Sequence, residues 1–290
     1  MSIKNVSFIG LGVMGYPMAG HLQKNGYNVT VFNRTESKAQ KWIEEYGGQM
    51  EKTPAEACSK AEIIFMCVGR DEDIIEVMEG DNGILTSEKK GTIIVDHTTA
   101  SASIARTYFE KLNKINIAFL DAPISGGQVG AENGVLSIML GGERKDFEIV
   151  KPALRSYGKA IELIGPSGSG QIAKMINQIC IAGLVQGLSE AMAFGKKANV
   201  DMEKVLSVIS KGAAQSWQME NRYRTMLDGK FDYGFAVDWM RKDLSICFKE
   251  AIKNGASLPI TEIVDKYYEK VQKNGGNRLD TSSLMTLVDK

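Results

Sequence analysis

The sequence predicts an α/β protein in which a doubly wound, mostly parallel sheet is followed by an all-helical C-terminal domain. Up to about residue 165, short apolar runs alternate with amphipathic segments, and this alternation is typical of a parallel sheet covered by helices. Beyond a stretch rich in glycine and serine at 165–170, only helical patterns remain. We therefore expect two domains, at residues 1–165 and 166–290.

The first domain contains several apolar runs of strand length, with helical periodicity between most of them. Ligands of doubly wound sheets bind beyond the carboxyl ends of the strands, so site residues are expected at the strand tails, among them Cys67 and Val68. Strands are expected at Val6–Ile9, Val29–Phe32, Ile63–Val68, Thr92–Asp96, Ala118–Asp121, Leu136–Leu140 and Ile161–Ile164. Helices are expected at Ser37–Tyr46, Asp71–Met78, Ser101–Leu112 and Asp146–Tyr157.

The second domain carries helical patterns only. The first of them is long and runs from about Gln171 to Ala198. Its most apolar run, Ile179–Leu188, contains Gln186 and is too short to span a bilayer. Further helices are expected at Met202–Lys211, Trp217–Leu227, Val237–Asn254, Thr261–Asn274 and Ser282–Val288.

Composition argues against several classes of protein. Basic and acidic side chains balance at 35 each, so no bulk field attracts nucleic acid or an anionic membrane. The four cysteines are widely spaced, with no C-x-x-C pair, and they indicate reduced thiols and no metal site. The N-terminus opens directly into a strand pattern, without the apolar core of a signal peptide. We expect a cytoplasmic protein, with no metal, nucleic acid or membrane as its partner.

A glycine-rich turn follows the first expected strand and precedes a helical segment, and it carries the strongest functional signal. Its glycines have the G-x-G-x-x-G spacing of a dinucleotide-binding turn, whose second glycine lets a pyrophosphate approach the backbone. Packing alone can also produce such a turn, but the strand–turn–helix context favours a dinucleotide bound at the helix N-terminus. The expected cofactor contacts in this turn are Gly10, Leu11, Gly12, Val13, Met14 and Gly15.

The residues after the second expected strand bear on which dinucleotide is bound. An NAD-preferring site usually places Asp or Glu here, to accept a hydrogen bond from the ribose 2′-hydroxyl. The sequence instead has Asn33, Arg34 and Thr35, and a guanidinium can pair with a 2′-phosphate. The alternative is that Arg34 is only a solvated turn residue. We expect NADP(H) to be preferred over NAD(H).

A strand end that runs into Asp121-Ala-Pro-Ile-Ser-Gly-Gly is a candidate substrate loop. The hydroxyl of Ser125 and the backbone N–H groups of Gly126 and Gly127 could bind a small carboxylate as an anion nest. A plain turn would have a similar sequence, so the segment alone is only moderately specific.

A second candidate lies at the start of the long helix. Helical spacing would place Lys174, Asn177 and Gln178 at i, i+3 and i+4, on one face of an otherwise apolar helix. Such a polar trio needs partners when it is buried. The partners could be a substrate, or they could be groups of an interdomain hydrogen-bond network without chemistry.

These motifs together resemble the β-hydroxyacid dehydrogenase family. The resemblance covers essentially the whole chain and rests on well-separated segments in the family's order: the glycine turn with Met18-Ala19, then Asp121–Gly127, then Gly168–Asn177, then Lys242-Asp243-Leu244. It implies a Rossmann-type N-terminal domain, a helical C-terminal domain and an active site between them. It also implies a homodimer or homotetramer in which the helical domains supply much of the contact.

The resemblance further implies roles for individual residues. Lys174 matches the family's catalytic lysine, and Thr99 and Lys242 match positions that contact the cofactor. Gln178 departs from the pattern, because many members carry Asn there, and the longer amide puts the length of the acid substrate in doubt. The positions that match the substrate loop and the substrate-orienting amides are Ser125, Gly126, Gly127, Asn177 and Gln178.

A lysine suits this chemistry, in which a hydride moves to or from a carbonyl carbon while a proton moves to or from the oxygen. A charged Lys174 polarises the carbonyl and protonates the forming alkoxide, and desolvation favours the neutral form that the reverse direction needs. His97 follows a strand end and is a rival acid, whereas His21 is expected to be structural. Trp217 is a candidate wall of the substrate pocket, and the alternative for it is a core or interface aromatic.

The sequence therefore predicts an NAD(P)-dependent oxidoreductase that interconverts a short β-hydroxy acid and its semialdehyde. Its substrate is thus a small carboxylate. Within the same family the substrate could instead be glyoxylate or succinic semialdehyde. An imine reductase of related architecture fits less well, since those enzymes generally lack a lysine at the position of Lys174. A non-catalytic dinucleotide-binding sensor is the alternative from another class, but it would need only the cofactor half of these residues.

Overall fold

The computed structural model describes residues 3–87 and 91–289. By their internal contacts these residues form two compact units, Met1–Lys174 and Met175–Lys290. A single helix, α8 (Ser169–Lys197), runs through the division between them. The boundary expected from the sequence lies earlier, at residue 165, before α8 begins.

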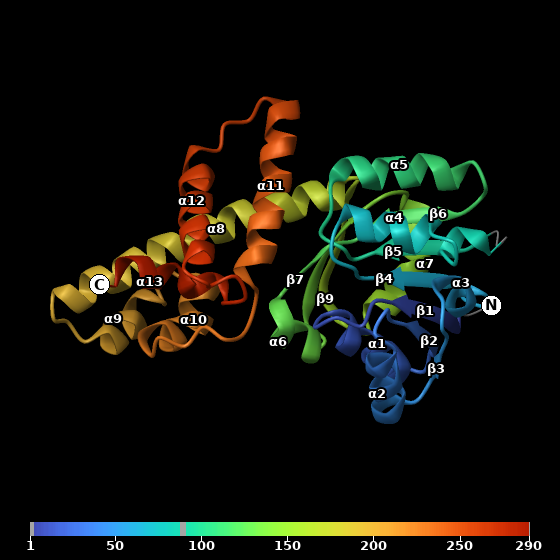
Figure 1. Ribbon diagram of the computed structural model, residues 1–290, viewed down its shortest axis with the longest axis horizontal. Coiled ribbons are helices and arrows are strands. Elements are labelled where there is room, and N and C mark those ends of the chain that lie inside the picture. Colours follow the sequence, from blue (N-terminus) through green and yellow to red (C-terminus); the bar gives the residue numbers. More distant parts are fainter. Residues whose placement is uncertain (1–2, 88–90, 290) are drawn as a thin grey trace. The chain divides into compact units, whose positions relative to one another are not determined.

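The first unit is built on a nine-stranded sheet with the order β3-β2-β1-β4-β5-β6-β8-β7, and β9 also pairs with β8 (Figure 1). All pairings from β3 across to β6 are parallel, whereas β8 runs antiparallel to β6 and β7. The expected doubly wound, mostly parallel sheet is therefore confirmed. The strands are β1 (Asn5–Ile9), β2 (Asn28–Phe32), β3 (Gln49–Met50), β4 (Ile63–Met66), β5 (Ile93–Asp96), β6 (Ala118–Asp121), β7 (Ile124–Ser125), β8 (Leu136–Gly141) and β9 (Gly158–Gly165).

The strand order predicts where a ligand binds to this sheet. The chain starts at β1, builds outward through β2 and β3, and then returns to β4 on the other side of β1. Connections therefore leave β1 and β4 in opposite directions, and in sheets of this kind ligands bind beyond the carboxyl ends of the strands at such a point. The glycine turn directly follows β1, and Cys67 and Val68 directly follow β4, so both lie at this edge.

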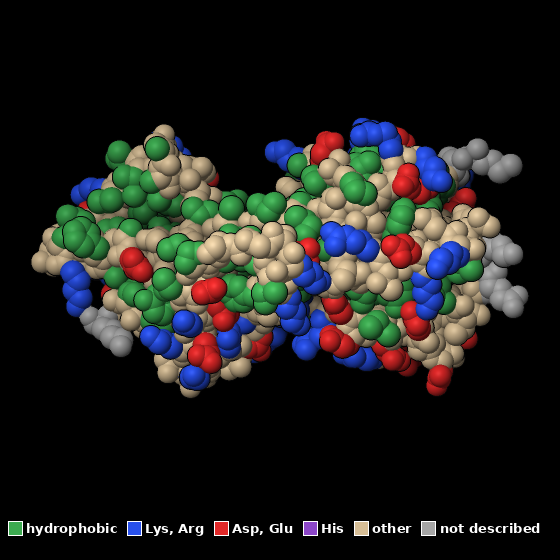
Figure 2. Space-filling model, turned by 90° about the horizontal axis from the view of Figure 1, so that it is seen from above, with side chains coloured by type: hydrophobic (Ala, Val, Ile, Leu, Met, Phe, Trp, Pro, Cys, Tyr) green, Lys and Arg blue, Asp and Glu red, His purple; other side chains and the backbone are tan. Residues whose placement is uncertain are grey.

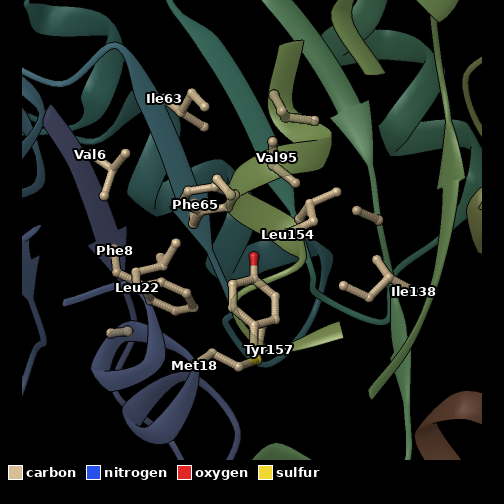
Figure 3. Close-up of a cluster of buried hydrophobic side chains, with 14 of the residues drawn as sticks. Val6, Phe8, Met18, Leu22, Ile63, Phe65, Val95, Ile138, Leu154 and Tyr157 are labelled. Atoms are coloured by element: carbon tan, nitrogen blue, oxygen red, sulfur yellow. The ribbon is translucent and has the colours of Figure 1, made fainter. Parts of the chain in front are cut away.

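Both faces of the sheet are buried, because successive strand residues point to opposite sides and helices cover each side. Phe8 and Phe65 belong to a core shared with α1, α2 and α7, where Tyr157 lies among Phe65, Leu154 and Met18 (Figure 3). A second core lies on the other face, under α3, α4 and α5. The helices are α1 (Gly15–Lys24), α2 (Glu36–Tyr46), α3 (Pro54–Cys58), α4 (Asp71–Glu79), α5 (Ala102–Asn113), α6 (Gly127–Glu132) and α7 (Arg144–Leu154), with a 3-10 turn η1 (Ile84–Thr86).

The second unit is helical. Over residues 175–289, all of them described, the only β contact is an isolated bridge between Ala236 and Asp280. Two apolar clusters fill this unit, one around Tyr268 and one around Met192. Besides α8 it contains α9 (Met202–Ile209), α10 (Trp217–Leu227), α11 (Val237–Asn254), α12 (Pro259–Lys273), η2 (Thr281–Leu284) and α13 (Met285–Val288).

The length of helix α8 corrects the expectation that its apolar run is too short to span a bilayer. That argument counted only the uninterrupted apolar run, whereas the helix that contains it has 29 residues and a most apolar window with mean hydropathy 1.2. By length and composition alone, α8 is therefore able to span a bilayer. In the structure 44% of that window is buried inside the protein.

Several short elements were not expected. Strands β3 and β7 have two residues each, which is too short for an alternating pattern to show. Helix α3 has two local start signals, the N-cap Thr53, whose hydroxyl accepts a hydrogen bond from Glu56 N–H, and Pro54 in its first turn.

Helix α7 was expected to reach Tyr157, but it ends at Leu154, and Tyr157 turns into the core instead.

Candidate active site

The glycines of the turn after β1 are required for two different reasons. Gly10 has φ +96°, and a Cβ there would collide with the carbonyl oxygen of Cys67. A Cβ at Gly15 would collide with the Gly10 carbonyl oxygen and lie 2.9 Å from the Phe8 ring. At Gly12, however, a Cβ would meet no atom within 4 Å. Packing accounts for Gly10 and Gly15, whereas the open space at Gly12 fits the approach of a pyrophosphate to the backbone.

Asn33 joins this turn to the tail of β2. Its Oδ1 accepts a hydrogen bond from Leu11 N–H (2.9 Å), and its Nδ2 donates to the Thr35 carbonyl (3.0 Å). The next residue, Arg34, is exposed and makes no hydrogen bond or ion pair within residues 3–87 and 91–289. The Asn33 amide therefore orders the loop, and the Arg34 guanidinium stays available beside the N-terminus of α2.

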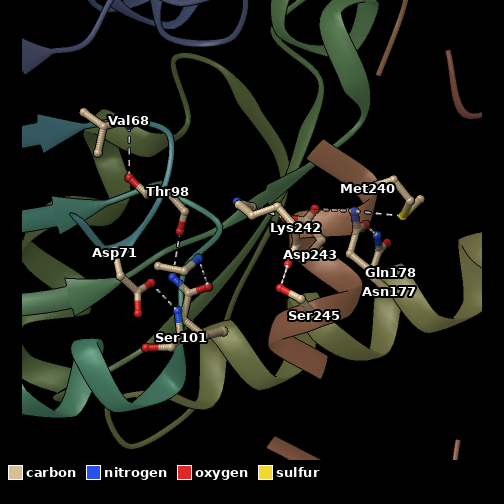
Figure 4. Close-up of polar contacts among 12 residues, drawn as sticks. Val68, Asp71, Thr98, Ser101, Asn177, Gln178, Met240, Lys242, Asp243 and Ser245 are labelled. Carbon is tan, nitrogen blue, oxygen red and sulfur yellow. Dashed lines mark hydrogen bonds and ion pairs between the residues drawn. The ribbon is translucent and has the colours of Figure 1, made fainter. Parts of the chain in front are cut away.

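The tails of β4 and β5 are joined by polar contacts (Figure 4). Val68 N–H donates to Thr98 Oγ1 (3.0 Å), and Thr98 N–H donates to Asp96 Oδ1 (2.9 Å). Asp96 is fully buried, and burial raises the pKa of its carboxyl from 3.8 to about 7, although the Thr98 hydrogen bonds act in the opposite sense. The expected contact residues Val68 and Thr99 thus lie in one ordered edge of the sheet.

Two residues without an expected role anchor the start of α8. Asp121, at the end of β6, accepts hydrogen bonds from Gly168 N–H (2.7 Å) and from Gln171 N–H (2.9 Å), as a helix cap does. Gln171 in turn bonds through its side chain to the backbone of Thr98 and Ala100. The sequence gives little signal for either role, because their partners lie 47 to 73 positions away along the chain.

The two histidines are both structural. His97 was a rival for the catalytic acid, but it is 1% exposed and stacks on Phe65. Its Nδ1 donates to the Ala122 carbonyl (2.7 Å), its Nε2 pairs with the Tyr157 hydroxyl (2.8 Å), and burial lowers its pKa to about 4. Because both nitrogens are bonded within the core, the alternative assignment to His97 is wrong. The Nε2 of His21 bonds to carbonyls at the end of α6, as a structural residue would.

The expected substrate loop is more ordered than a plain turn. Ser125 ends β7, where it pairs with Ser137 of β8, and Gly127 begins α6. Gly126 has φ +135° and Gly127 has φ +63°, backbone conformations that favour glycine. A Cβ at Gly127 would meet nothing within 4 Å, so its backbone is open to a ligand.

Lys174, Asn177 and Gln178 all lie on α8, as expected from their spacing. In the second unit a partly buried chain of contacts starts at Asn177, whose Nδ2 donates to Gln178 Oε1 (2.7 Å). Gln178 Nε2 then donates to Asp243 Oδ2 (2.6 Å), and the Lys242 ammonium lies 3.0 Å from Asp243 Oδ1 (Figure 4). Both ends of the Gln178 amide are therefore engaged by protein groups.

Trp217 begins α10 and is 44% exposed. The guanidinium of Arg222 lies 4.9 Å from its ring centroid and 4.9 Å from that of Tyr233, and it also pairs with Asp280. Trp217 thus has a structural partner in the second unit, and its role as a pocket wall stays a prediction.

Comparisons with known proteins extend this picture. A family model described as the NAD binding domain of 6-phosphogluconate dehydrogenase matches residues 5–165. A second, described as NAD-binding of NADP-dependent 3-hydroxyisobutyrate dehydrogenase, matches residues 168–288. A solved structure of Mycobacterium tuberculosis 3-hydroxyisobutyrate dehydrogenase with L-serine superposes with a TM-score of 0.88 at 24% identity, over 100% of both chains, which shows a shared fold.

Curated relatives match along nearly the whole chain. An uncharacterized oxidoreductase of Shewanella frigidimarina is 56% identical over 98% of both chains. The 2-hydroxy-3-oxopropionate reductase of Escherichia coli is 34% identical over 98% of this chain and 97% of the relative. The mitochondrial 3-hydroxyisobutyrate dehydrogenase of Rattus norvegicus is 30% identical, covering 96% and 85%. The chain therefore belongs to the β-hydroxyacid dehydrogenase family and is an NAD(P)-dependent dehydrogenase.

Proposed function

We propose that this enzyme interconverts a short β-hydroxy acid and its semialdehyde, with Lys174 as the proton donor and acceptor. The observation that carries the proposal is the attachment of Lys174 to the cofactor edge of the sheet. Lys174 lies one helical turn after Gln171, where α8 is tied to the tails of β5 and β6. Its side chain is 8% exposed, and shielding from water strengthens the interaction of an ammonium with a carbonyl oxygen.

The roles of the residues follow from the chemistry of their side chains. When bound, the nicotinamide of NAD(P) supplies or accepts the hydride at the carbonyl carbon. In reduction, the Lys174 ammonium donates a hydrogen bond to the carbonyl oxygen and then transfers its proton to the forming alkoxide. In oxidation, neutral Lys174 accepts the hydroxyl proton. The Ser125 hydroxyl and the open backbone at Gly127 provide hydrogen-bond donors for the substrate carboxylate. The resemblance to the family assigns Asn177 as a substrate-orienting amide, and its Nδ2 is a donor of the same kind.

We infer a preference for NADP(H) over NAD(H) from the tail of β2. The exposed Arg34 guanidinium is available for a 2′-phosphate, and the N-terminus of α2 adds a favourable dipole. No carboxylate occupies the position of Asn33, where one would repel that phosphate. Glu36 in the first turn of α2 opposes the preference, which makes it moderate.

We also propose that the chain forms a homodimer or homotetramer through α8. Hydrophobic side chains gather on the face of the second unit drawn in Figure 2, and Phe194 on α8 is 77% exposed. A Cβ at Gly183 or Gly187 would meet nothing within 4 Å, so neither glycine serves packing inside this chain. Glycines on an exposed helix face allow a second helix to approach closely. Light scattering of the purified protein measures the resulting mass. The exposed positions along one side of α8 are Ile176, Cys180, Leu184, Gly187, Ala191 and Phe194.

The test of the proposed reaction compares wild type with Lys174→Met, which keeps an unbranched side chain one atom shorter but removes the ammonium. Initial rates are measured with NADPH and with NADH on 2-hydroxy-3-oxopropionate, methylmalonate semialdehyde, succinic semialdehyde and glyoxylate. General acid catalysis contributes about 10²–10⁴-fold, so turnover should fall by at least two orders of magnitude in the variant. NADPH binding, followed by fluorescence, should stay within about twofold.

Two results would contradict the proposal. Turnover that survives in Lys174→Met would show that another group or water handles the proton. NADPH binding without turnover on any of these aldehydes, and without further thermal stabilisation by small carboxylates, would favour the dinucleotide-binding sensor.

A further inference from the structure

We propose that Gln171 is a positioning residue for the nicotinamide half of the cofactor, which it serves by holding the segment Thr98–Ala100 at a fixed place relative to Lys174. The proposal rests on the proposed function, because it takes Lys174 as the proton donor. It assigns a role to a buried amide that the reaction itself does not use.

The side chain of Gln171 bonds to the backbone on both sides of Thr99. Its Oε1 accepts a hydrogen bond from Ala100 N–H (3.0 Å), and its Nε2 donates to the Thr98 carbonyl (2.7 Å). One partner can only donate and the other can only accept, so the orientation of the amide is determined. Residues 98–100 belong to no strand or helix. The Gln171 amide therefore provides the hydrogen-bond partners that a strand or helix would give to the backbone groups of Thr98 and Ala100.

Gln171 is itself held in place. It is 1% exposed, and its own N–H donates to Asp121 Oδ2 (2.9 Å), while Asp121 Oδ1 accepts from Gly168 N–H. Lys174 follows three residues later on the same helix, so the two side chains lie on neighbouring positions of one face. Gln171 therefore holds the segment around Thr99 at a fixed place relative to Lys174.

The strand order indicates which half of the cofactor this segment meets. The adenosine end belongs to the tail of β2, where Arg34 lies, and the pyrophosphate belongs to the turn after β1. Strands β4 and β5 continue the sheet on the opposite side of β1. Thr99, which follows β5, thus lies on the side left for the nicotinamide half.

This placement separates a positioning role from a merely structural one. Loss of the Gln171 bonds should weaken binding of the complete dinucleotide, but it should leave binding of the adenosine half unchanged. General destabilisation of the unit would weaken both.

The experiment uses the full-length enzyme and three variants. Gln171→Glu is isosteric but cannot donate to the Thr98 carbonyl, Gln171→Met removes both bonds, and Gln171→Asn is too short to make both. The Kd values of NADPH and of 2′,5′-ADP, which carries only the adenosine half, are measured by calorimetry. Gln186→Met is the matched control, because Gln186 is a buried amide on the same helix, and within residues 3–87 and 91–289 its side chain bonds only to Glu190.

We expect the Kd of NADPH to rise about tenfold in Gln171→Glu and Gln171→Met, with the Kd of 2′,5′-ADP changed less than twofold. Turnover should fall about tenfold, and Gln186→Met should match wild type in both Kd values. Equal weakening of both ligands, or unchanged NADPH binding in all three variants, would overturn the proposal. The binding measurements need no substrate, so they decide this inference even if the proposed reaction is wrong. If Gln171→Met does not fold, the milder Gln171→Asn and Gln171→Glu decide it.

Discussion

Two polar networks of this enzyme are built in different ways. In the first unit, Asp121 and Gln171 bond mainly to backbone N–H and carbonyl groups. In the second unit, the contacts from Asn177 through Gln178 and Asp243 run from side chain to side chain. Hydrogen bonds from a side chain to the backbone hold the path of a loop or the start of a helix. Hydrogen bonds between two side chains hold only the rotamers of those side chains. Damage to the first network should therefore cost stability as well as the cofactor binding proposed for Gln171, and damage to the second should cost mainly substrate affinity.

The largest expected effect is that of Asp121→Ala in the first network. The substitution leaves the buried N–H groups of Gly168 and Gln171 without their acceptor at the start of α8. Loss of such bonds should lower the free energy of unfolding by about 3 kcal/mol. Urea unfolding followed by circular dichroism measures the change. Asp121→Asn keeps one acceptor oxygen and therefore one of the two bonds, so it should lose about half as much; equal losses in the two variants would show that the bonds are not the cause.

A second effect in the first network depends on pH. The Asp96 carboxyl titrates near 3.8 when unfolded and at about 7 when folded, because it is buried. Between these values the folded state binds more protons than the unfolded state, so this group makes stability fall as pH rises. Relative to Asp96→Asn, which cannot ionise, the wild type should lose about 2 kcal/mol between pH 5 and pH 7.

Urea unfolding of both proteins over this range tests the expectation, and the difference between them removes other titrations, such as that of His97 below pH 6.5. A difference that does not change with pH would show that Asp96 ionises normally in the folded protein. Asp96→Asn should retain the bond from Thr98 N–H, because its side-chain oxygen can still accept.

The two networks also differ in how far the sequence predicted them. The sheet, the long helix and the spacing of Lys174, Asn177 and Gln178 follow from local periodicity, which a single sequence displays. Asp121 and Gln171 gave no such signal, because a helix cap contributed from another strand depends on the tertiary fold. The alternative role for His97 failed for the same reason: its place after a strand suggested the cofactor edge, but its side chain turns into the core against Phe65 and Tyr157.

Glycine roles show the same limit within a single motif. The spacing of Gly10, Gly12 and Gly15 predicted a dinucleotide-binding turn, and the family of the chain confirms NAD(P) binding. Only the structure separates Gly10 and Gly15, which packing requires, from Gly12, where the space is open. A pattern of residue types therefore locates a site. Whether a given glycine is needed for packing or for binding can be decided only from the distances to its neighbouring atoms in the structure.

The smallest effect on stability is expected from Gln178→Met in the second network. Met fills a similar volume but cannot accept from Asn177 or donate to Asp243, so Asn177 loses the bond that sets its rotamer. The KM for the carboxylate substrate should rise about tenfold, equivalent to about 1.4 kcal/mol, while kcat and the Kd of NADPH change less than threefold. The free energy of unfolding should fall by about 1 kcal/mol, less than in Asp121→Ala, because the Asp243 carboxylate loses one donor but keeps its pair with Lys242. A stability loss as large as that of Asp121→Ala, with KM unchanged, would mean that this network too is structural, and that the contrast between the two units does not hold.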